Sequence, residues 1–307
     1  MRWPALAALA TVLACRGDQW PRPAPQPYEQ FVAQFDSWRE DRRNRLVQPP
    51  AGPVILAGLW ELGEGATAMG RDSSLPIVLP AADAPRLAGI VRRSGQDVRF
   101  EPASGSGVRL ADGTPVTAPR ALASDRTDSA TVLAVGSLRL RVHGEPGTDR
   151  LWLRAWDEAH PARTTFRLPD TYPPDTTWRL AARFEPYAEP REYRVEDVVA
   201  GTQAYIASGD LVFRTGGREL RLAASGDSGS TTLFIMFWDS TARSTTYEAG
   251  RYVRTPLPDS TGWTVLDFNR AYNPPCVFTP YSTCAFPPRE NRLPLAIPAG
   301  ERRLRPK

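Results

Sequence analysis

The chain of 307 residues is poor in the side chains that most often carry metal and nucleophile chemistry. It has three cysteines, three methionines and two histidines, and its one lysine is Lys307. A structural zinc site takes four ligands, so Cys276 and Cys284 would need both His143 and His160 as partners. The sequence has no phosphate-binding glycine loop and no dinucleotide fingerprint. We therefore expect no metal and no cofactor.

Concentrated charge is also missing. Arginine and lysine number 38 against 34 acidic residues, and the net charge of +4 is spread along the chain. Nucleic-acid binding needs a clustered basic patch, so we expect no nucleic-acid partner. Hydrophobic residues make up 41%, which excludes wholesale disorder. The 31 prolines and 23 glycines favour short elements joined by turns, and so β-structure over long helices.

No apolar run at the N-terminus is long enough to cross a bilayer. Arg2 is followed by an apolar stretch that ends in Val-Leu-Ala before Cys15. Residues 1–14 are typical of a signal peptide, and the last of them resemble a bacterial lipobox, in which the cysteine is lipidated. We expect an exported lipoprotein of the cell envelope, anchored to a membrane through Cys15. The alternatives are an ordinary signal peptide or a cytoplasmic chain with an apolar start.

The next two segments predict a tether and a helix. Residues 15–27 are rich in proline, so we expect an extended tether that holds the folded part away from the membrane. In residues 28–50, apolar side chains recur at three-, four- and seven-residue spacings, which indicates one amphipathic helix. Pro49 and Pro50 end it. Its apolar stripe is expected to dock on the protein body, since its polar face mixes acidic and basic residues.

From residue 51 onward the sequence predicts an all-β protein. Short apolar or alternating runs are broken by glycine, proline, aspartate and serine, which is the pattern of antiparallel β sandwiches. We expect a first sandwich over residues 51–149 and a second β-rich unit over residues 150–307.

Two cysteines eight residues apart raise the question of a disulfide. In an oxidising compartment Cys276 and Cys284 are expected to pair, and the bond would close a short loop. A metal site and two free thiols are the alternatives.

Residues 55–145 resemble the forkhead-associated (FHA) sandwich, which is related to SMAD-like folds. The matching stretches are Gly70-Arg71, residues 77–79, the turn at Asp112-Gly113 and residues 135–138. FHA domains commonly bind phosphothreonine through this arginine, a Ser-Arg-x-His stretch and a turn asparagine. Here residues 85–88 lack that serine and histidine, and Asp112 stands where the asparagine would be. The resemblance implies the fold without phosphopeptide binding.

A second resemblance extends over nearly the whole chain after Cys15. The most specific stretch is 266–276, Leu-Asp-Phe-Asn-Arg-Ala-Tyr-Asn-Pro-Pro-Cys, and residues 178–184, 246–252 and 291–301 add to it. These residues resemble the bacterial family known as domain of unknown function 1684 (DUF1684). Ala285-Phe286 departs from the Pro-Leu that the family usually has there. The resemblance implies no activity, because the family has none established.

The C-terminal segment holds the candidate ligand-binding residues. Prolines 274 and 275 exclude a helix, so the segment must be a rigid loop whose backbone groups need side-chain partners. One interpretation is structural, and in the other the loop presents polar groups to a ligand. The candidate ligand-binding residues are Tyr247, Arg251, Asp267, Asn269, Tyr272, Asn273 and Asn291.

The sequence contains no catalytic motif that supports an enzymatic function. Residues 226–230, Gly-Asp-Ser-Gly-Ser, imitate a serine-protease loop, but a nucleophilic serine needs a histidine base held by a carboxylate, and neither His143 nor His160 lies in a recognisable motif. We expect a non-catalytic module that binds a small molecule or an envelope protein. The alternatives are a hydrolase with a polar cleft around the C-terminal loop and a purely structural envelope protein.

Overall fold

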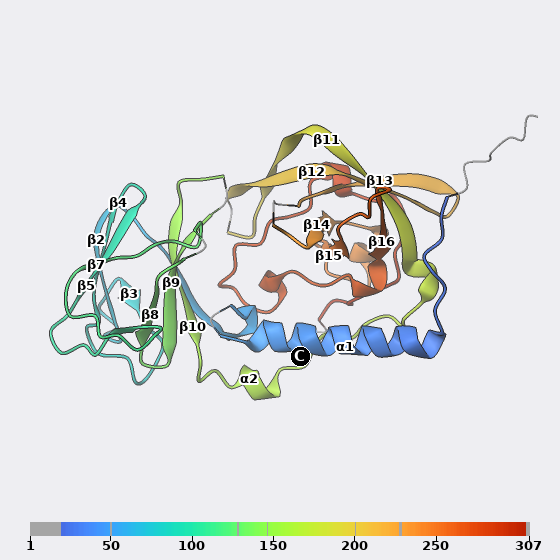
Figure 1. Ribbon diagram of the computed structural model, residues 1–307. Helices are drawn as coiled ribbons and strands as arrows, with labels where there is room; N and C mark the ends of the chain where they lie inside the picture. The colour runs from blue at the N-terminus through green and yellow to red at the C-terminus, as the bar shows by residue number, and fades with distance from the viewer. Residues whose placement is uncertain are drawn as a thin grey trace, which may run out of the picture.

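The molecule consists of two β-rich units that lie side by side, as Figure 1 shows. A computed structural model describes residues 20–49, 51–127, 129–145, 147–199, 201–226 and 229–304. The predicted signal peptide and Cys15 lie outside these residues. The fold is mainly antiparallel β-sheet with one long N-terminal helix, so the predicted fold class is confirmed.

The long helix α1 covers Tyr28–Val47 and packs against the second unit. Its buried positions include Phe31, Phe35 and Leu46, which belong to the predicted apolar stripe. Gln48 already has an extended backbone, as expected for a residue that precedes proline. The helix therefore ends three residues before the predicted boundary.

The first unit is a sandwich of two five-stranded sheets, and the cluster of side chains buried between them is its core. All strand pairs are antiparallel except β2 and β3. One sheet has the order β1-β10-β9-β8-β6 and contains Leu56–Glu61, Leu151–Asp157, Leu138–Gly144, Val132–Val135 and Arg109–Leu110. The other has the order β3-β2-β4-β5-β7 and contains Ile77–Val78, Gly65–Gly70, Gly89–Ser94, Asp97–Pro102 and Arg120–Ala121.

Strand β10 shows where the first unit ends. The predicted boundary between residues 149 and 150 falls just before this strand. All seven residues of β10 pair with β9, and its other edge pairs with β1. The first sandwich therefore includes residues up to Asp157.

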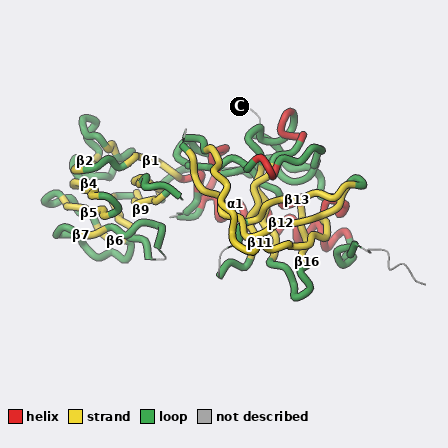
Figure 2. The backbone as a smooth tube through the Cα atoms, turned by 90° about the horizontal axis from the view of Figure 1, so that it is seen from above, coloured by secondary structure: helices red, strands yellow, loops and turns green. Residues whose placement is uncertain are grey.

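The second unit is built from two smaller sheets, and Figure 2 labels the strands of the larger one. The four-stranded sheet has the order β13-β12-β11-β16 and contains Arg218–Ala224, Thr202–Thr215, Arg179–Glu196 and Trp263–Asp267. The two-stranded sheet pairs β14 (Thr232–Phe237) with β15 (Arg251–Pro256). Phe213, Phe237 and Phe268 pack edge to face in the core between them. Short helices fill the connections: α2 (Ala162–Thr165), η1 (Pro53–Ile55), η2 (Thr176–Trp178), η3 (Ser240–Arg243), η4 (Phe268–Arg270), η5 (Pro275–Val277) and η6 (Arg289–Asn291).

The described part of the predicted tether lies against the second unit. The indole N–H of Trp20 donates to the carbonyl of Ala181 at 3.2 Å, and its ring meets Trp263 edge to face. Arg179 donates to the carbonyl of Ala24 at 3.0 Å. Residues 20–27 are therefore extended, and contacts at Trp20 and Ala24 attach them to β11 and β16.

Among the described residues, no helix is both long and apolar enough to cross a membrane.

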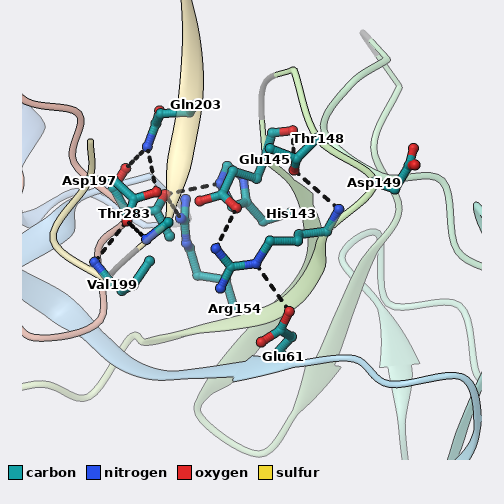
Figure 3. A network of polar contacts seen from close by, with 12 residues as sticks. Glu61, His143, Glu145, Thr148, Asp149, Arg154, Asp197, Val199, Gln203 and Thr283 are labelled. Atoms are coloured by element: carbon teal, nitrogen blue, oxygen red, sulfur yellow. Dashed lines mark hydrogen bonds and ion pairs between the residues drawn. The ribbon is translucent and has the colours of Figure 1, made fainter. Parts of the chain in front are cut away.

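A buried carboxyl group lies where the two units meet (Figure 3). Glu145 follows β9, is fully buried and is ion-paired with Arg150 at 3.1 Å. Neither of its carboxylate oxygens accepts a hydrogen bond. Burial raises the pKa of Glu145, and the charge of Asp197 from the second unit adds to this effect.

The raised pKa of Glu145 predicts a pH-dependent cost to stability. Between the ordinary pKa of 4.5 and the raised value, the folded protein holds a proton that the unfolded chain has released, so stability falls as pH rises through this window. We expect Glu145→Gln to raise the melting temperature at pH 8 and to leave it unchanged near pH 4. Asp149→Asn, at an exposed acid of the same loop, is the control and should not alter the pH profile. An equal effect of Glu145→Gln at both pH values would contradict the prediction.

Candidate functional site

Arg251, at the start of β15, lies inside the second unit. Its side chain is fully buried, and Nη2 is 3.0 Å from Oδ1 of Asp239. Nη2 also donates to the carbonyl of Ile297 at 3.0 Å, and Nη1 donates to that of Ala299. Burial lowers the pKa of Arg251, and the ion pair with Asp239 opposes this effect. The arginine therefore ties the C-terminal segment to the sheet.

Asp267 and Asn269 form a local cap at the end of β16. Asp267 accepts hydrogen bonds from the backbone N–H of Asn269 at 3.0 Å and from its side-chain amide at 2.8 Å. Asn269 also exchanges two hydrogen bonds with the backbone of Asp175. Burial raises the pKa of Asp267, although Asn269 and the nearby Arg270 oppose this effect.

Asn273, Asn291 and Tyr247 also have partners within the chain. The side-chain amide of Asn273 donates to the carbonyl of Arg302 at 2.9 Å. The fully buried Asn291 bridges β13 and β14 through the backbones of Ala223 and Met236. The hydroxyl of Tyr247 is 3.8 Å from Sγ of Cys276. The ligand-binding role of these residues remains a prediction.

The prediction of a disulfide between Cys276 and Cys284 is wrong. Cys276 and Cys284 are free thiols. They are nevertheless neighbours, because the backbone N–H of Cys276 donates to Sγ of Cys284 at 3.0 Å and the hydroxyl of Ser282 is 3.3 Å from the same sulfur. The hydrogen bond from the Cys276 thiol is the main cause of a lowered pKa at Cys284, and burial opposes it. The short spacing in the sequence places the two thiols close together, but they do not form a bond.

Tyr272 differs from the other predicted residues because it borders a pocket. The pocket has a volume of about 390 Å³ and lies between α1 and the second unit. We call it the arginine pocket. Its lining residues are Trp38, Arg42, Arg45, Thr232, Arg254, Arg270 and Tyr272.

Two of the four arginines in the arginine pocket have a carboxylate partner. Arg42 is buried and binds Glu301 through two parallel contacts, of which Nη2 to Oε2 is 3.0 Å. Nε of Arg270 is 3.6 Å from Oδ2 of Asp267. Both acids lie outside the lining set.

The other two arginines give the pocket its excess charge. The guanidinium of Arg254 lies 4.8 Å from the ring centroid of Phe234 and contacts Thr232 at 3.4 Å. Arg45 is exposed on the last turn of α1. With two carboxylates set against four guanidinium groups, the pocket keeps an excess of two positive charges.

Aromatic rings complete the arginine pocket. The guanidinium of Arg42 lies 4.4 Å from the ring centroid of Tyr272, which fixes both side chains. Burial raises the pKa of Tyr272, so its hydroxyl stays protonated at neutral pH. Trp38 on α1 supplies a second ring. The pocket therefore combines positively charged hydrogen-bond donors with flat aromatic faces. This combination suits an anionic molecule that contains a ring.

The arginines of this pocket were not predicted, although the sequence of α1 carries a signal for them. Trp38, Arg42 and Arg45 are spaced by four and three residues, so they share one face of the helix. Arg42 lies on the buried face of α1 with Phe35 and Leu46, a face that was predicted from its apolar residues alone. Arg254 and Arg270 come close to them only through the fold. Among the described residues, no group of three or more histidine, cysteine or acidic side chains could hold a metal ion.

Comparison with known proteins gives a match to one family model and likenesses to several solved structures. The family model described as "Protein of unknown function (DUF1684)" matches residues 164–302. The structure of an uncharacterised protein from gene locus rrnAC0354 of Haloarcula marismortui is 32% identical and covers 47% of this chain and 80% of its own, with a TM-score of 0.38. No curated protein matches the chain.

The second structure is EmbR of Mycobacterium tuberculosis in complex with a low-affinity phosphopeptide. It is 12% identical and covers 44% of this chain and 33% of its own, with a TM-score of 0.22. At these TM-scores neither likeness carries a structural argument. The match to the DUF1684 model confirms that predicted resemblance.

Proposed function

Because this chain belongs to the DUF1684 family, whose function is unknown, we propose its role from the site itself: it is a cell-envelope module that binds small anionic molecules in the arginine pocket. The observation that carries the proposal is the excess of two positive charges in a pocket of about 390 Å³. Arginine recognises carboxylate and phosphate groups through paired N–H donors. A volume of this size is typical of small-molecule sites.

The chemistry of the lining narrows the ligand to a ring compound that carries a phosphate or a carboxylate. Arg45 and Arg254 supply the charge that has no carboxylate partner among the lining contacts. Trp38 and Tyr272 supply faces on which a sugar or an aromatic ring can stack. Sugar phosphates and uronic acids combine both features.

The location belongs to the same proposal. A signal peptide over residues 1–14 and lipidation of Cys15 would export the protein and attach it to a membrane. The module would then meet its ligand, or an envelope protein that carries the anionic group, outside the cytoplasm.

The proposal predicts which ligands and which variants change affinity. Isothermal titration with glucose 6-phosphate, glucuronate and glucose should show binding of the two anions and none of the neutral sugar. Arg45→Ala and Arg254→Ala should each weaken anion binding by at least about tenfold, because a charge-assisted hydrogen bond contributes about 1.5–3 kcal/mol. Raising the salt concentration should weaken binding further.

Arg99→Ala is the matched control, since Arg99 is an exposed arginine of β5 in the other unit. Its affinity for both anions should equal that of the wild type. Equal binding of glucose, or unchanged affinity in both pocket variants, would contradict the proposal.

A further inference from the structure

His143, one of two histidines in the chain, lies where the two units meet. It is the sixth residue of β9, and its Nδ1 is 2.9 Å from Oδ2 of Asp125. The other oxygen of Asp125 accepts the backbone N–H of Gly144 at 3.0 Å, so the carboxylate is fixed in place. A carboxylate therefore holds His143, although the sequence around this histidine forms no recognisable motif.

The second nitrogen of the ring faces a hydroxyl from the other unit. Nε2 of His143 is 3.3 Å from Oγ1 of Thr283, a residue 140 positions later in the chain. Because an ionised carboxylate only accepts, Asp125 keeps the proton of the ring on Nδ1 and leaves a lone pair on Nε2. The Thr283 hydroxyl then donates to Nε2, which is the arrangement of an acid–histidine–hydroxyl triad.

The charges of the triad suit a general base. Burial lowers the pKa of His143, so the ring is neutral at pH 7. Burial alone would raise the pKa of Asp125, but the hydrogen bond with His143 and the charge of Arg141 hold it below its ordinary value. The protonation states on both residues are those that the triad needs.

Thr283 is held firmly by its backbone. Its carbonyl accepts from the side-chain amide of Gln203 at 2.7 Å, as Figure 3 shows. The carbonyl of the next residue, Cys284, accepts from the N–H of Val198 at 3.1 Å. These contacts fix the Thr283 hydroxyl before any ligand arrives, and preorganisation of this kind is what catalysis requires.

Two arginines beside the triad have donors to spare. Nη2 of Arg154 donates to Oγ1 of Thr283 at 3.3 Å, and Nη2 of Arg141 is 3.3 Å from Asp125. The Nε atoms of both arginines are buried and have no hydrogen-bond partner. Burial lowers the pKa of Arg154 to about 10, which leaves it charged at pH 7. Nη2 of Arg154, which already contacts the Thr283 hydroxyl, is placed to donate to the oxygen of a polarised carbonyl or an oxyanion.

Solvent reaches the cluster. The side chains of His143 and Asp125 keep 14% and 17% of their exposure, and Thr283 is half-buried. The small exposed area of these side chains favours a small acyl group.

We propose that Asp125, His143 and Thr283 form a nucleophilic site that cleaves short-chain carboxylic esters, with Arg154 binding the carbonyl oxygen. Oγ1 of Thr283 attacks the carbonyl carbon while its proton passes to Nε2 of His143. The C–O bond to the leaving alcohol breaks, and His143 returns the proton to that alcohol. A water molecule, activated in the same way, then hydrolyses the acyl-threonine to the free acid and restores the hydroxyl.

The test is labelling of the purified full-length chain with a fluorophosphonate, followed by mass spectrometry to locate the adduct. Labelling joins Oγ1 to phosphorus and releases fluoride, with the proton taken up by His143. We expect the adduct on Thr283. We expect Thr283→Val to abolish it and Thr283→Ser to retain it. Asp125→Asn should slow labelling at least about a hundredfold, because it misplaces the ring proton.

Hydrolysis of p-nitrophenyl acetate should follow the same order of variants and should fall when the pH drops below the pKa of His143. Thr279→Ala is the control, because Thr279 is a buried threonine of the same loop and should leave both rates unchanged. An unlabelled wild type, an adduct on another residue, or normal labelling of Thr283→Val would overturn the proposal. If Thr283→Val does not fold, the position of the adduct in the wild type and in Thr283→Ser is enough to decide whether residue 283 is the nucleophile.

Discussion

Replacing Arg251 by alanine is expected to lower the free energy of unfolding by about 3–5 kcal/mol. The substitution leaves the buried carboxylate of Asp239 without its counter-charge. It also removes the donors for the carbonyls of Ile297 and Ala299, which attach the C-terminal segment to the sheet. Since the whole stability of a domain is about 5–15 kcal/mol, the loss is severe. Urea denaturation followed by tryptophan fluorescence measures it.

Two further variants separate charge from volume. Arg251→Met refills most of the space but still leaves Asp239 unpaired, so it should be nearly as destabilising as Arg251→Ala. Arg243→Ala removes an exposed arginine of the nearby helix η3 and should change stability by less than about 1 kcal/mol. A loss of under about 1 kcal/mol in Arg251→Ala would show that the ion pair does not hold this segment.

Glu301→Gln is the second large effect, again about 3–5 kcal/mol. Glu301 is 1% exposed, binds the guanidinium of Arg42 through both oxygens and accepts the backbone N–H of Asn273 at 2.8 Å. The amide keeps the shape but removes the charge that neutralises a buried arginine. Because Arg42 belongs to α1, the substitution should weaken the contact between this helix and the second unit more than it weakens the rest of the fold. Hydrogen exchange of the α1 amides should therefore accelerate before global unfolding.

Glu290→Gln is the matched control, because Glu290 is an exposed acid of η6 in the same C-terminal segment. Its exchange and stability should match those of the wild type. Global destabilisation of Glu301→Gln with unchanged α1 exchange would mean that the helix is held by its apolar face alone.

Local physics made parts of the fold predictable. The α1 helix follows from the spacing of Phe31, Phe35 and Leu46, and its end follows from Pro49. Strand β9 alternates buried and half-buried residues from Leu138 onward, as its sequence alternates apolar and polar side chains. Both patterns depend only on neighbours a few residues apart, so no knowledge of the fold was needed.

The polar contacts that define both candidate sites join distant residues. Arg42 and Glu301 are 259 positions apart, and His143 and Thr283 are 140 apart. Nothing in the local pattern of either partner indicates the other. The chain also returns on itself, since α1 precedes the first sandwich yet packs on the second unit. Sequence analysis therefore named Tyr272 of the arginine pocket but not the arginines around it.

The C-terminal segment shows a different limit. Its asparagines and aspartates were correctly expected to satisfy backbone groups in a loop that proline keeps irregular. Asn291, which bridges Ala223 and Met236, is such a residue. The same polar side chains would suit a ligand site, so residue type alone did not separate the two interpretations.

The docking of Trp20 against β11 and β16 sets how any anchored form would stand on a bilayer. An extended chain spans at most about 3.6 Å per residue, so a lipid on Cys15 would hold Trp20 within about 18 Å of the headgroups. A tether that had no contact with the folded body before Pro27 would span more than twice this distance. The shorter connection restricts rotation of the folded body relative to the membrane, so one end of the molecule would stay closer to the bilayer than the other. In Figure 1 the first sandwich lies at the end of the molecule away from the N-terminal end of α1, so in an anchored form it would be the part farther from the lipid.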